Sequence, residues 1–254
     1  MFFINLFESK ISVKNFVLHI TYYTSTQSTN EDIWELYNNE KKSNILVITD
    51  NQLNGKGQFN NTWYSMPNKS ITCSFLLNQV FDNKKINFHS LIIPISIVRG
   101  IKKMLSINVK LKWPNDIMYD NKKLGGILIE SKKSLSNYIF NIGIGLNVNE
   151  DINDFPSDLK NKAISLKMIK GYPIQREPLL ASIFNALDEL ISNINYNDII
   201  EEWMNDCMHK NNKIKFKYKN QMISGIFKNI NKHGQAIIDH KKMLFFYDGP
   251  IQII

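Results

Sequence analysis

Two short motifs constrain the fold of this chain more than any other feature. The first is Lys112-Trp113-Pro114-Asn115-Asp116, and Lys123-Leu124-Gly125-Gly126 follows after six residues. A strand predicted over residues 109–113 ends at Pro114, because proline lacks the N–H of a ladder and holds the residue before it extended. The polar residues after Pro114 therefore lie at a strand end, where they can meet a ligand.

The same segment predicts a site for an anion. Asp120-Asn121 is a hairpin signal, and the hairpin brings Lys123 back beside Asn115 and Asp116. An ammonium held near a carboxylate and an amide suits a phosphate and a developing negative charge. Gly125-Gly126 would let backbone groups touch the ligand directly. An ordinary hairpin with a polar turn is the alternative, and finding both motifs together disfavours it.

Three other segments could contact a ligand, although each has an ordinary structural explanation. They are Ser28-Thr29-Asn30, the loop from Gln52 to Gln58, and the strand segment from Gly143 to Asn147. Helix capping would explain the first, and Gly-Lys-Gly is common in surface loops. The two glycines of the third favour close approach of a ligand to the strand, or else a bulge or tight sheet packing. The loop lacks the spacing and the Lys-Ser/Thr ending of a P-loop.

Hydrophobic periodicity predicts an α+β chain in two parts. Strands are expected at 17–24, 46–49, 71–77, 109–113, 117–119, 123–131 and 138–148, and helices at 31–40, 91–106, 173–194 and 199–208. After residue 208 the pattern changes to short strands at 214–218, 222–227, 235–239 and 243–247, with turns at 219–220, 231–234 and 240–241. We therefore predict a main domain over residues 1–208 and a small β-barrel over 209–254.

Composition excludes several classes of protein. The 254 residues are 43% hydrophobic and 21% charged, which fits a globular chain, and the net charge of +8 favours an acidic partner without identifying it. Cys73 and Cys207 match no metal or redox spacing, and the histidines show no paired spacing, so no protein metal site is expected. The apolar start lacks a signal-peptide pattern and residues 91–98 are too short for a span, so we expect a cytoplasmic protein without membrane contacts.

Taken in order, these segments resemble the biotin protein ligase family. The resemblance runs from about residue 17 to 194 and is most specific over 112–131, while the C-terminal segment looks like the family's small SH3-like barrel. It implies a mixed β-sheet flanked by helices. It also implies an enzyme that makes biotinyl-5′-AMP from biotin and MgATP, and then transfers biotin to a lysine of a biotin carboxyl carrier domain of a carboxylase.

The resemblance also assigns roles to individual residues. Catalytic roles fall to Lys123, Asp116 and Asn115. Biotin would be contacted by Ser28, Thr29, Asn30, Gln52, Lys56, Gly57, Gln58, Trp63, Lys123 and Gly126. ATP would be contacted by Lys56, Lys112, Asn115, Lys123 and Asn147, with Mg²⁺ held through ATP rather than by protein side chains.

The chain departs from the family pattern in one loop. Where the family has Gly-Arg-Gly-Arg/Gln-Arg-Gly, this chain has Gly55-Lys56-Gly57-Gln58-Phe59-Asn60. Lysine cannot make the bidentate contacts of arginine, so we expect the loop to hold the adenylate less firmly. About sixteen residues precede the first predicted strand, too few for the winged helix of bifunctional members, and we expect no DNA binding.

Two rival functions remain open. A lipoate ligase shares the activation chemistry, but the arginine-glycine-glycine loop of those enzymes has no counterpart here, and Lys112 to Asp116 favours biotin. A nucleic-acid-binding module would fit the basic charge, but aromatic and basic residues do not interleave in any recognisable RNA motif. The oligomeric state, including a weak homodimer, is left open by the sequence.

Overall fold

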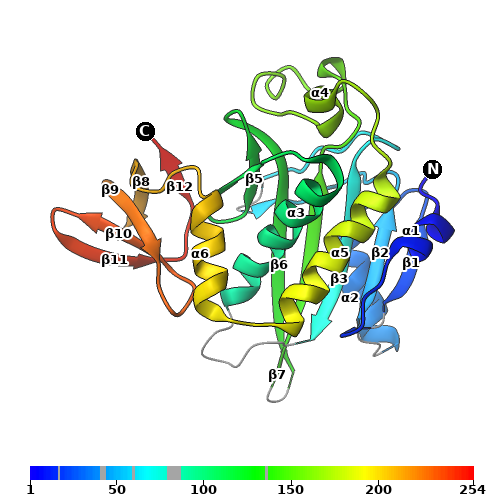
Figure 1. The fold of residues 1–254 in the computed structure, drawn as a ribbon, viewed down its shortest axis with the longest axis horizontal. Helices are drawn as coiled ribbons and strands as arrows, with labels where there is room; N and C mark the ends of the chain where they lie inside the picture. Colours follow the sequence, from blue (N-terminus) through cyan, green and yellow to red (C-terminus); the bar gives the residue numbers. More distant parts are fainter. Residues whose placement is uncertain (17, 41–43, 59–60, 79–86, 135–136) are drawn as a thin grey trace.

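A seven-stranded mixed sheet forms the centre of the molecule (Figure 1). The computed structural model describes residues 1–254 apart from 17, 41–43, 59–60, 79–86 and 135–136. The strands are β1 (His19–Tyr23), β2 (Ile45–Thr49), β3 (Ile71–Asn78), β4 (Lys110–Lys112), β5 (Asp116–Tyr119), β6 (Lys122–Ser134) and β7 (Asn137–Leu146). Their order is β1-β2-β3-β7-β6-β5-β4, with β1 and β2 parallel and the other neighbours antiparallel.

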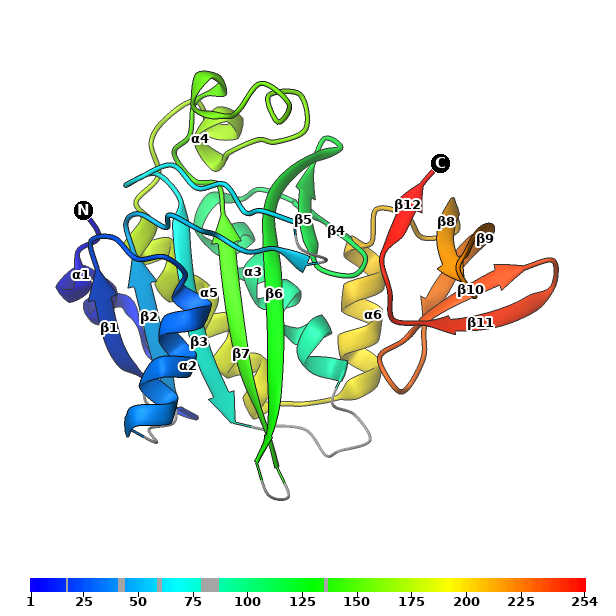
Figure 2. The same cartoon turned by 180° about the vertical axis from the view of Figure 1, so that it is seen from behind.

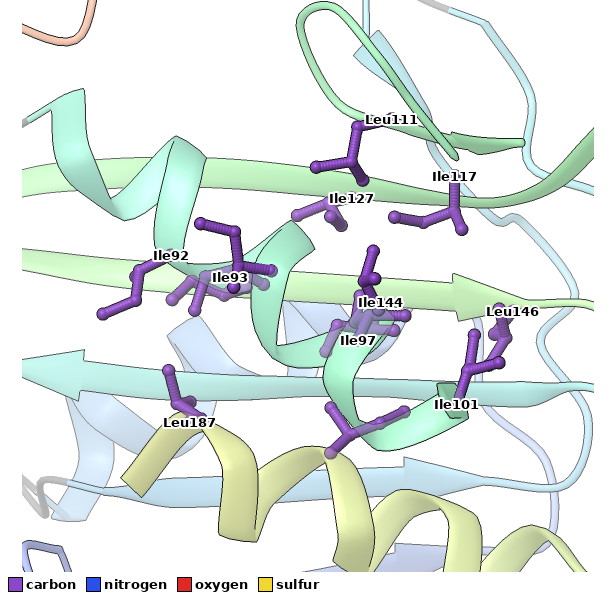
Figure 3. Packing of buried hydrophobic residues seen from close by; sticks show 14 of the residues in the cluster. Ile92, Ile93, Ile97, Ile101, Leu111, Ile117, Ile127, Ile144, Leu146 and Leu187 are labelled. Atoms are coloured by element: carbon purple, nitrogen blue, oxygen red, sulfur yellow. The ribbon is translucent and has the colours of Figure 1, made fainter. Parts of the chain in front are cut away.

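Helices cover both faces of this sheet. Helices α3 (His89–Leu105) and α5 (Arg176–Ser192) lie on one face, and α2 (Thr29–Glu40) lies on the other, as the two opposite views show (Figures 1 and 2). Ile93 and Ile97 of α3 pack toward Ile127 and Ile144 of the central strands (Figure 3). Apolar residues buried at helical spacing on α3 and on alternate positions of β6 and β7 thus form one core.

The predicted α+β main part is confirmed, with two helices that periodicity missed. Helix α1 (Ile4–Lys10) packs on α5 through Phe7, which is fully buried, and α4 (Leu166–Lys170) begins after the N-cap Ser165. Both helices are no longer than two turns, so neither repeats an apolar stripe often enough to be recognised. The hairpin at Asp120-Asn121 is confirmed, since both residues have positive φ angles of 45° and 60°.

A second, five-stranded antiparallel sheet follows α6 (Tyr196–Asp206). It contains β8 (Lys213–Tyr218), β9 (Gln221–Ile230), β10 (Ala236–His240), β11 (Met243–Tyr247) and β12 (Ile251–Ile253), in the order β11-β10-β9-β8-β12. Phe216, Phe227 and Ile238 form its buried centre. The last hairpin turn lies at Lys241-Lys242, with φ angles of 51° and 68°, one residue beyond the predicted 240–241.

The C-terminal sheet is joined to the main sheet through Trp113. Its side chain is 3% exposed, packs edge-on against Trp203, and contacts Phe227 of β9. The indole N–H donates a hydrogen bond of 3.0 Å to the carbonyl of Gly249. The motif that ends the strand before Pro114 therefore also fixes the barrel against the main sheet. Within the described part of the chain, every helix is too short or too polar to cross a lipid bilayer.

Candidate active site

A pocket opens on the α2 side of the main sheet. On this side the described residues between β2 and β3 cross in front of β7 and β6 (Figure 2). The walls of the pocket come from the start of α2, the 51–69 loop, and strands β3, β6 and β7. The lining residues are Ser28, Thr29, Asn30, Gln52, Lys56, Gly57, Gln58, Trp63, Thr72, Cys73, Asn115, Lys123, Gly126, Ile127, Leu128, Gly143, Ile144 and Gly145. Segments that are far apart in sequence thus share one concave site.

Polar side chains at the start of α2 are fixed by a continuous hydrogen-bond network. The backbone N–H of Thr29 donates to Oε1 of Gln52 at 2.9 Å, and the Thr29 and Ser74 hydroxyls lie 2.6 Å apart. Ser74 also donates to Oδ1 of Asn30 at 2.5 Å. Thr29 and Asn30 are almost fully buried, so these bonds hold both side chains in single orientations.

A carboxylate beneath this network anchors Asn30 and α2. Oε2 of Glu130 on β6 accepts from Nδ2 of Asn30 at 3.3 Å and from the indole N–H of Trp34 at 2.8 Å. Asn141 of β7 donates to the Asn30 carbonyl at 2.8 Å. Glu130 was missed from the sequence, although Gly126, Leu128 and Glu130 alternate on one face of β6, which is the pattern that could have revealed it.

The two glycines of β7 make room for two side chains of the pocket wall. A Cβ on Gly145 would lie 2.6 Å from Cζ2 of Trp63, and a Cβ on Gly143 would overlap Oδ1 of Asn30. Real Cβ atoms do not approach other atoms so closely, so any larger residue would displace Trp63 or Asn30. The indole and the amide occupy that space, and both glycines line the pocket beside them, so the approach of a ligand to the β7 backbone stays a prediction.

The β5–β6 hairpin supplies the charged groups. Nζ of Lys123 lies 2.5 Å from Oδ1 of Asp116 and 5.9 Å from the centre of the Trp63 ring. Nδ2 of Asn115 donates to the carbonyl of Ile127 at 2.5 Å, which fixes the amide at the pocket floor. The hairpin thus places an ammonium and a carboxylate side by side at the pocket, as its turn residues predicted.

A second cavity continues from this pocket toward the C-terminal barrel. It shares Gly57, Gln58, Trp63, Asn115 and Lys123 with the pocket, and is otherwise lined by Asn61, Thr62, Lys112, Trp113, Pro114, Asp116, Pro250 and Ile251. Lys112 faces Asp116 in the β4–β5 register. The two hollows together could hold an elongated ligand with a neutral end among Thr29 and Gln52 and an anionic part beside Lys123 and Lys112.

Comparison with known proteins now identifies the family. A model described as the biotin/lipoate A/B protein ligase family matches residues 22–149 of this chain. The chain belongs to this family. Relatives include the bifunctional ligase/repressor BirA of Bacillus subtilis, 33% identical over 174 residues, which are 67% of this chain and 53% of the relative. Biotin--protein ligase 2 of Arabidopsis thaliana is 25% identical over 87% of this chain and 68% of its own length.

Solved structures of biotin protein ligases share the fold. One from Aquifex aeolicus in complex with biotin and ATP superposes with a TM-score of 0.78 and 22% identity over 93% of this chain and 98% of that chain. One from Leishmania major with biotinyl-5-AMP gives 0.64 and 20% identity, covering 93% of this chain and 98% of that chain. The α+β fold with a small C-terminal SH3-like unit is thereby confirmed. The chain spans about half the length of the BirA relatives that it matches.

The structure brings together all ten residues for which the family resemblance predicted contacts with biotin: Ser28, Thr29, Asn30, Gln52, Lys56, Gly57, Gln58, Trp63, Lys123 and Gly126. Of the five expected at the nucleotide, Lys56, Asn115 and Lys123 line the pocket, and Lys112 lines the adjoining cavity. Asn147 lines neither hollow. Its amide is buried and donates to the carbonyls of Lys123 and Ile164 at 3.4 and 3.1 Å, so it holds the Lys123 backbone in place.

Backbone hydrogen bonds join the described residues on the two sides of the loop that departs from the family pattern. The N–H of Gly57 donates to the carbonyl of Asn61 at 2.7 Å, and the N–H of Trp63 donates to the carbonyl of Gly55 at 2.9 Å. Lys56 is 56% exposed and pairs with Glu31 of α2. Phe59 and Asn60 lie outside the described residues. Among the described residues, no group of three or more His, Cys, Asp or Glu side chains could hold a metal ion.

Proposed function

We propose that this protein is an ATP-dependent biotin protein ligase, which activates biotin as biotinyl-5′-AMP and transfers it to a lysine of a biotin carboxyl carrier domain. The observation that carries the proposal is the convergence of the ten expected biotin residues on one pocket, with Lys123 at its charged end. We also infer that residues 1–208 form the catalytic domain and 209–254 a barrel domain.

The pocket offers matched groups for biotin. The fixed side chains of Thr29, Asn30 and Gln52 would hydrogen-bond the polar ring of biotin, and the Trp63 indole would cover its apolar chain. The carboxylate at the end of that chain would then reach Lys123. This arrangement explains why one end of the hollow is neutral and well ordered while the other is cationic.

In the first step a biotin carboxylate oxygen attacks the α-phosphorus of ATP, a new P–O bond forms, and the bond to the leaving pyrophosphate breaks. Two anions must approach each other, and the Lys123 ammonium lowers their repulsion at the point of contact. Asp116 holds that ammonium at 2.5 Å and so fixes its direction. Mg²⁺ carried by the ATP phosphates would neutralise further charge.

In the second step the amine of the carrier lysine attacks the acyl carbon of biotinyl-5′-AMP. A C–N bond forms, the C–O bond to AMP breaks, and the amine loses a proton. Lys56, Gly57, Gln58 and Trp63 line the pocket and would keep water away from this mixed anhydride. Backbone hydrogen bonds from Gly57 to Asn61 and from Trp63 to Gly55 would hold these residues in place, without the arginines that the family pattern has.

Pyrophosphate exchange tests the substrate. We expect ATP–pyrophosphate exchange that depends on biotin and is not supported by lipoate, because the polar groups around Thr29 and Gln52 would remain unpaired around a dithiolane ring. Exchange that depends on lipoate and not on biotin would assign the chain to the lipoate branch of the family. No exchange with either acid would refute the proposal.

A further inference from the structure

The positive charge of this chain is concentrated in its C-terminal barrel. Residues 209–254 contain nine lysines, two aspartates and no glutamate or arginine. The formal net charge of this segment is therefore +7, out of +8 for the whole chain. The remaining 208 residues are close to neutral. A charge imbalance of this size within one chain favours an anionic partner for the charged part rather than for the whole surface.

Three of these lysines form a row on β8. Lys213, Lys215 and Lys217 are exposed and alternate with the buried Ile214 and Phe216. Alternation places the three ammonium groups on the outer face of one strand, about 7 Å apart. Like charges at this spacing repel one another, so the row costs stability in the free protein.

No carboxylate of the barrel neutralises the row. Asp239 accepts from the backbone N–H of Lys242 in a turn, and Asp248 accepts from the side chain of Gln235. Across the described part of the chain, every ion pair joins residues outside 209–254. The neighbouring strands β9 and β12 contain no acidic residue. The row is therefore left free for an external acidic group.

The row lies beside the mouth of the catalytic cavity. Strand β12 pairs with β8, with Ile251 opposite Phe216 and Gln252 opposite Lys215. Ile251 and the preceding Pro250 line the cavity that contains Lys112 and Lys123. In both ribbon views β12 is the barrel strand next to the β4–β5 hairpin (Figures 1 and 2). Strand β8 is thus one strand away from the strand that borders the cavity, about 5 Å between backbones, and its lysines lie on the outer face, opposite to that of Ile251.

We propose that the outer face of β8, with Lys213, Lys215 and Lys217, is the docking surface for an acidic face of the carrier domain that receives biotin. The proposal rests on the proposed function, because only the transfer step requires a protein at this rim. A row of cations beside the mouth increases the rate of encounter with an acidic protein and orients it. Met222 is 52% exposed opposite Lys217 and adds an apolar contact.

A nucleic acid fits this face less well. Stacking of bases needs an aromatic ring with an open face beside the cations. Tyr218, at the end of β8, has the Nζ of Lys219 over its ring at 5.5 Å and the edge of Phe245 against it at 4.9 Å. The ring that adjoins the row on β8 is therefore partly covered, and between the lysines the strand has the buried Ile214 and Phe216 instead of open rings.

The test is a triple charge reversal, Lys213→Glu, Lys215→Glu and Lys217→Glu, in the full chain. The matched control reverses three exposed lysines away from the barrel, Lys14, Lys102 and Lys133, and changes the net charge equally. Carrier-independent ATP–pyrophosphate exchange and biotin transfer to a purified carrier domain are measured for each, at low and at physiological salt. Binding of a single-stranded oligothymidylate is measured in parallel.

We expect normal ATP–pyrophosphate exchange in both variants. In the β8 variant alone, kcat/KM for the carrier domain should fall by about tenfold or more, because the KM for the carrier rises. The transfer rate of the unaltered chain should fall with salt, and that of the β8 variant should not. Equal transfer by the β8 variant and the control would overturn the docking surface while leaving the ligase proposal intact. Loss of oligothymidylate binding with unchanged transfer would assign the row to a nucleic acid. Absence of exchange in the unaltered chain would remove both proposals.

Discussion

The indole of Trp63 occupies the space that a side chain on Gly145 would need, since a Cβ there would lie 2.6 Å from its Cζ2 and Nε1 atoms. A glycine in the interior of a strand and a tryptophan in a loop therefore depend on each other. The wall of the proposed biotin pocket exists because one of them has no side chain.

This dependence predicts the effect of Gly145→Ala. We expect a loss of stability of about 1–3 kcal/mol from overpacking and at least a tenfold rise in the KM for biotin. In a Trp63→Leu background the same change should cost almost no stability, because the clashing ring is gone. Denaturant unfolding of the four proteins measures the coupling. Additive effects would show that Gly145 and Trp63 do not compete for this space.

Lys123 is expected to act in activation rather than in folding. Lys123→Ala should lower biotin-dependent pyrophosphate exchange by about a hundredfold or more, because it removes the charge that offsets the approach of carboxylate and phosphate. Lys122→Ala, a change of the neighbouring lysine in the same hairpin, is the control and should keep exchange near normal. Normal exchange by a folded Lys123→Ala protein would end the assignment.

Arg176 is expected to hold the loop between Asp50 and Ser70 in position through contacts with these two residues. Its guanidinium donates to Oδ1 of Asp50 at 2.9 Å and to the carbonyl of Ser70 at 3.1 Å, so one buried side chain ties both ends of the loop. Burial raises the pKa of Asp50, but hydrogen bonds from Tyr22 and Arg176 outweigh it and leave the pKa below its ordinary value. Asp50 is therefore a buried anion that needs its partner.

Arg176→Met should therefore raise the KM for biotin and expose the loop to proteolysis. It should also destabilise the fold by up to about 3–5 kcal/mol, since Asp50 loses its buried charged partner and keeps only the N-terminal ammonium, 3.7 Å away. The double variant Arg176→Met with Asp50→Leu should recover much of the stability without recovering the KM. Limited proteolysis and biotin kinetics together make the test. If the double variant had the same KM for biotin as the unaltered protein, the Arg176–Asp50 pair would have no role in positioning the loop.

His209 should make the fold sensitive to mild acid. Its ring is fully buried against Phe227, and burial followed by the charge of Lys112 lowers its pKa from 6.5 to about 4. The unfolded chain binds a proton at His209 below pH 6.5, whereas the folded chain does so only near pH 4, so stability falls as the pH drops through this window. At pH 5 the loss from this group is about 2 kcal/mol.

The variant His209→Leu should lose that part of the pH dependence. Urea unfolding at pH 7.5 and pH 5 measures it for both proteins, and the difference in unfolding free energy between the two pH values should shrink by about 2 kcal/mol in the variant. Identical pH dependence in the two proteins would show that His209 is not kept neutral in the folded state.

The loop with Lys56 is expected to retain the adenylate incompletely. Lys56 forms its ion pair with Glu31 at the surface, and a lysine cannot hold a phosphate bidentately. Labelling of bystander lysines in a mixture of proteins should be detectable, and Lys56→Arg should reduce it several-fold. Labelling confined to the carrier domain at saturating ATP would contradict this.

Local signals in the sequence predicted the sheet and its long helices, whereas the resemblance to the family supplied the expected pocket residues. Pro114, the Asp120-Asn121 turn and the glycines of β7 each restrict the backbone within a few residues, so their consequences can be worked out without a structure. Contacts made at long range could not be predicted in this way. The bond from Trp113 to Gly249 and the clamp of Arg176 on Asp50 and Ser70 join residues more than a hundred positions apart.

The glycines of β7 show how much of a close approach the sequence can predict. Either a ligand or tight packing was expected at their backbone, and Trp63 and Asn30 of the same chain lie beside them in the pocket wall. Asn147, for which the family resemblance implies a contact with the nucleotide, donates its amide to the carbonyls of Lys123 and Ile164, two bonds that the local sequence does not reveal. Which partner fills a gap depends on the tertiary fold and not on the local pattern.

The most direct test of the account is the mass of a purified biotin carboxyl carrier domain after incubation with this protein, biotin and MgATP. We predict a gain of one biotinyl group, absent when ATP is omitted and when the target lysine of the carrier is replaced by arginine. A carrier of unchanged mass, under conditions in which another biotin protein ligase modifies the same domain fully, would contradict the proposed function.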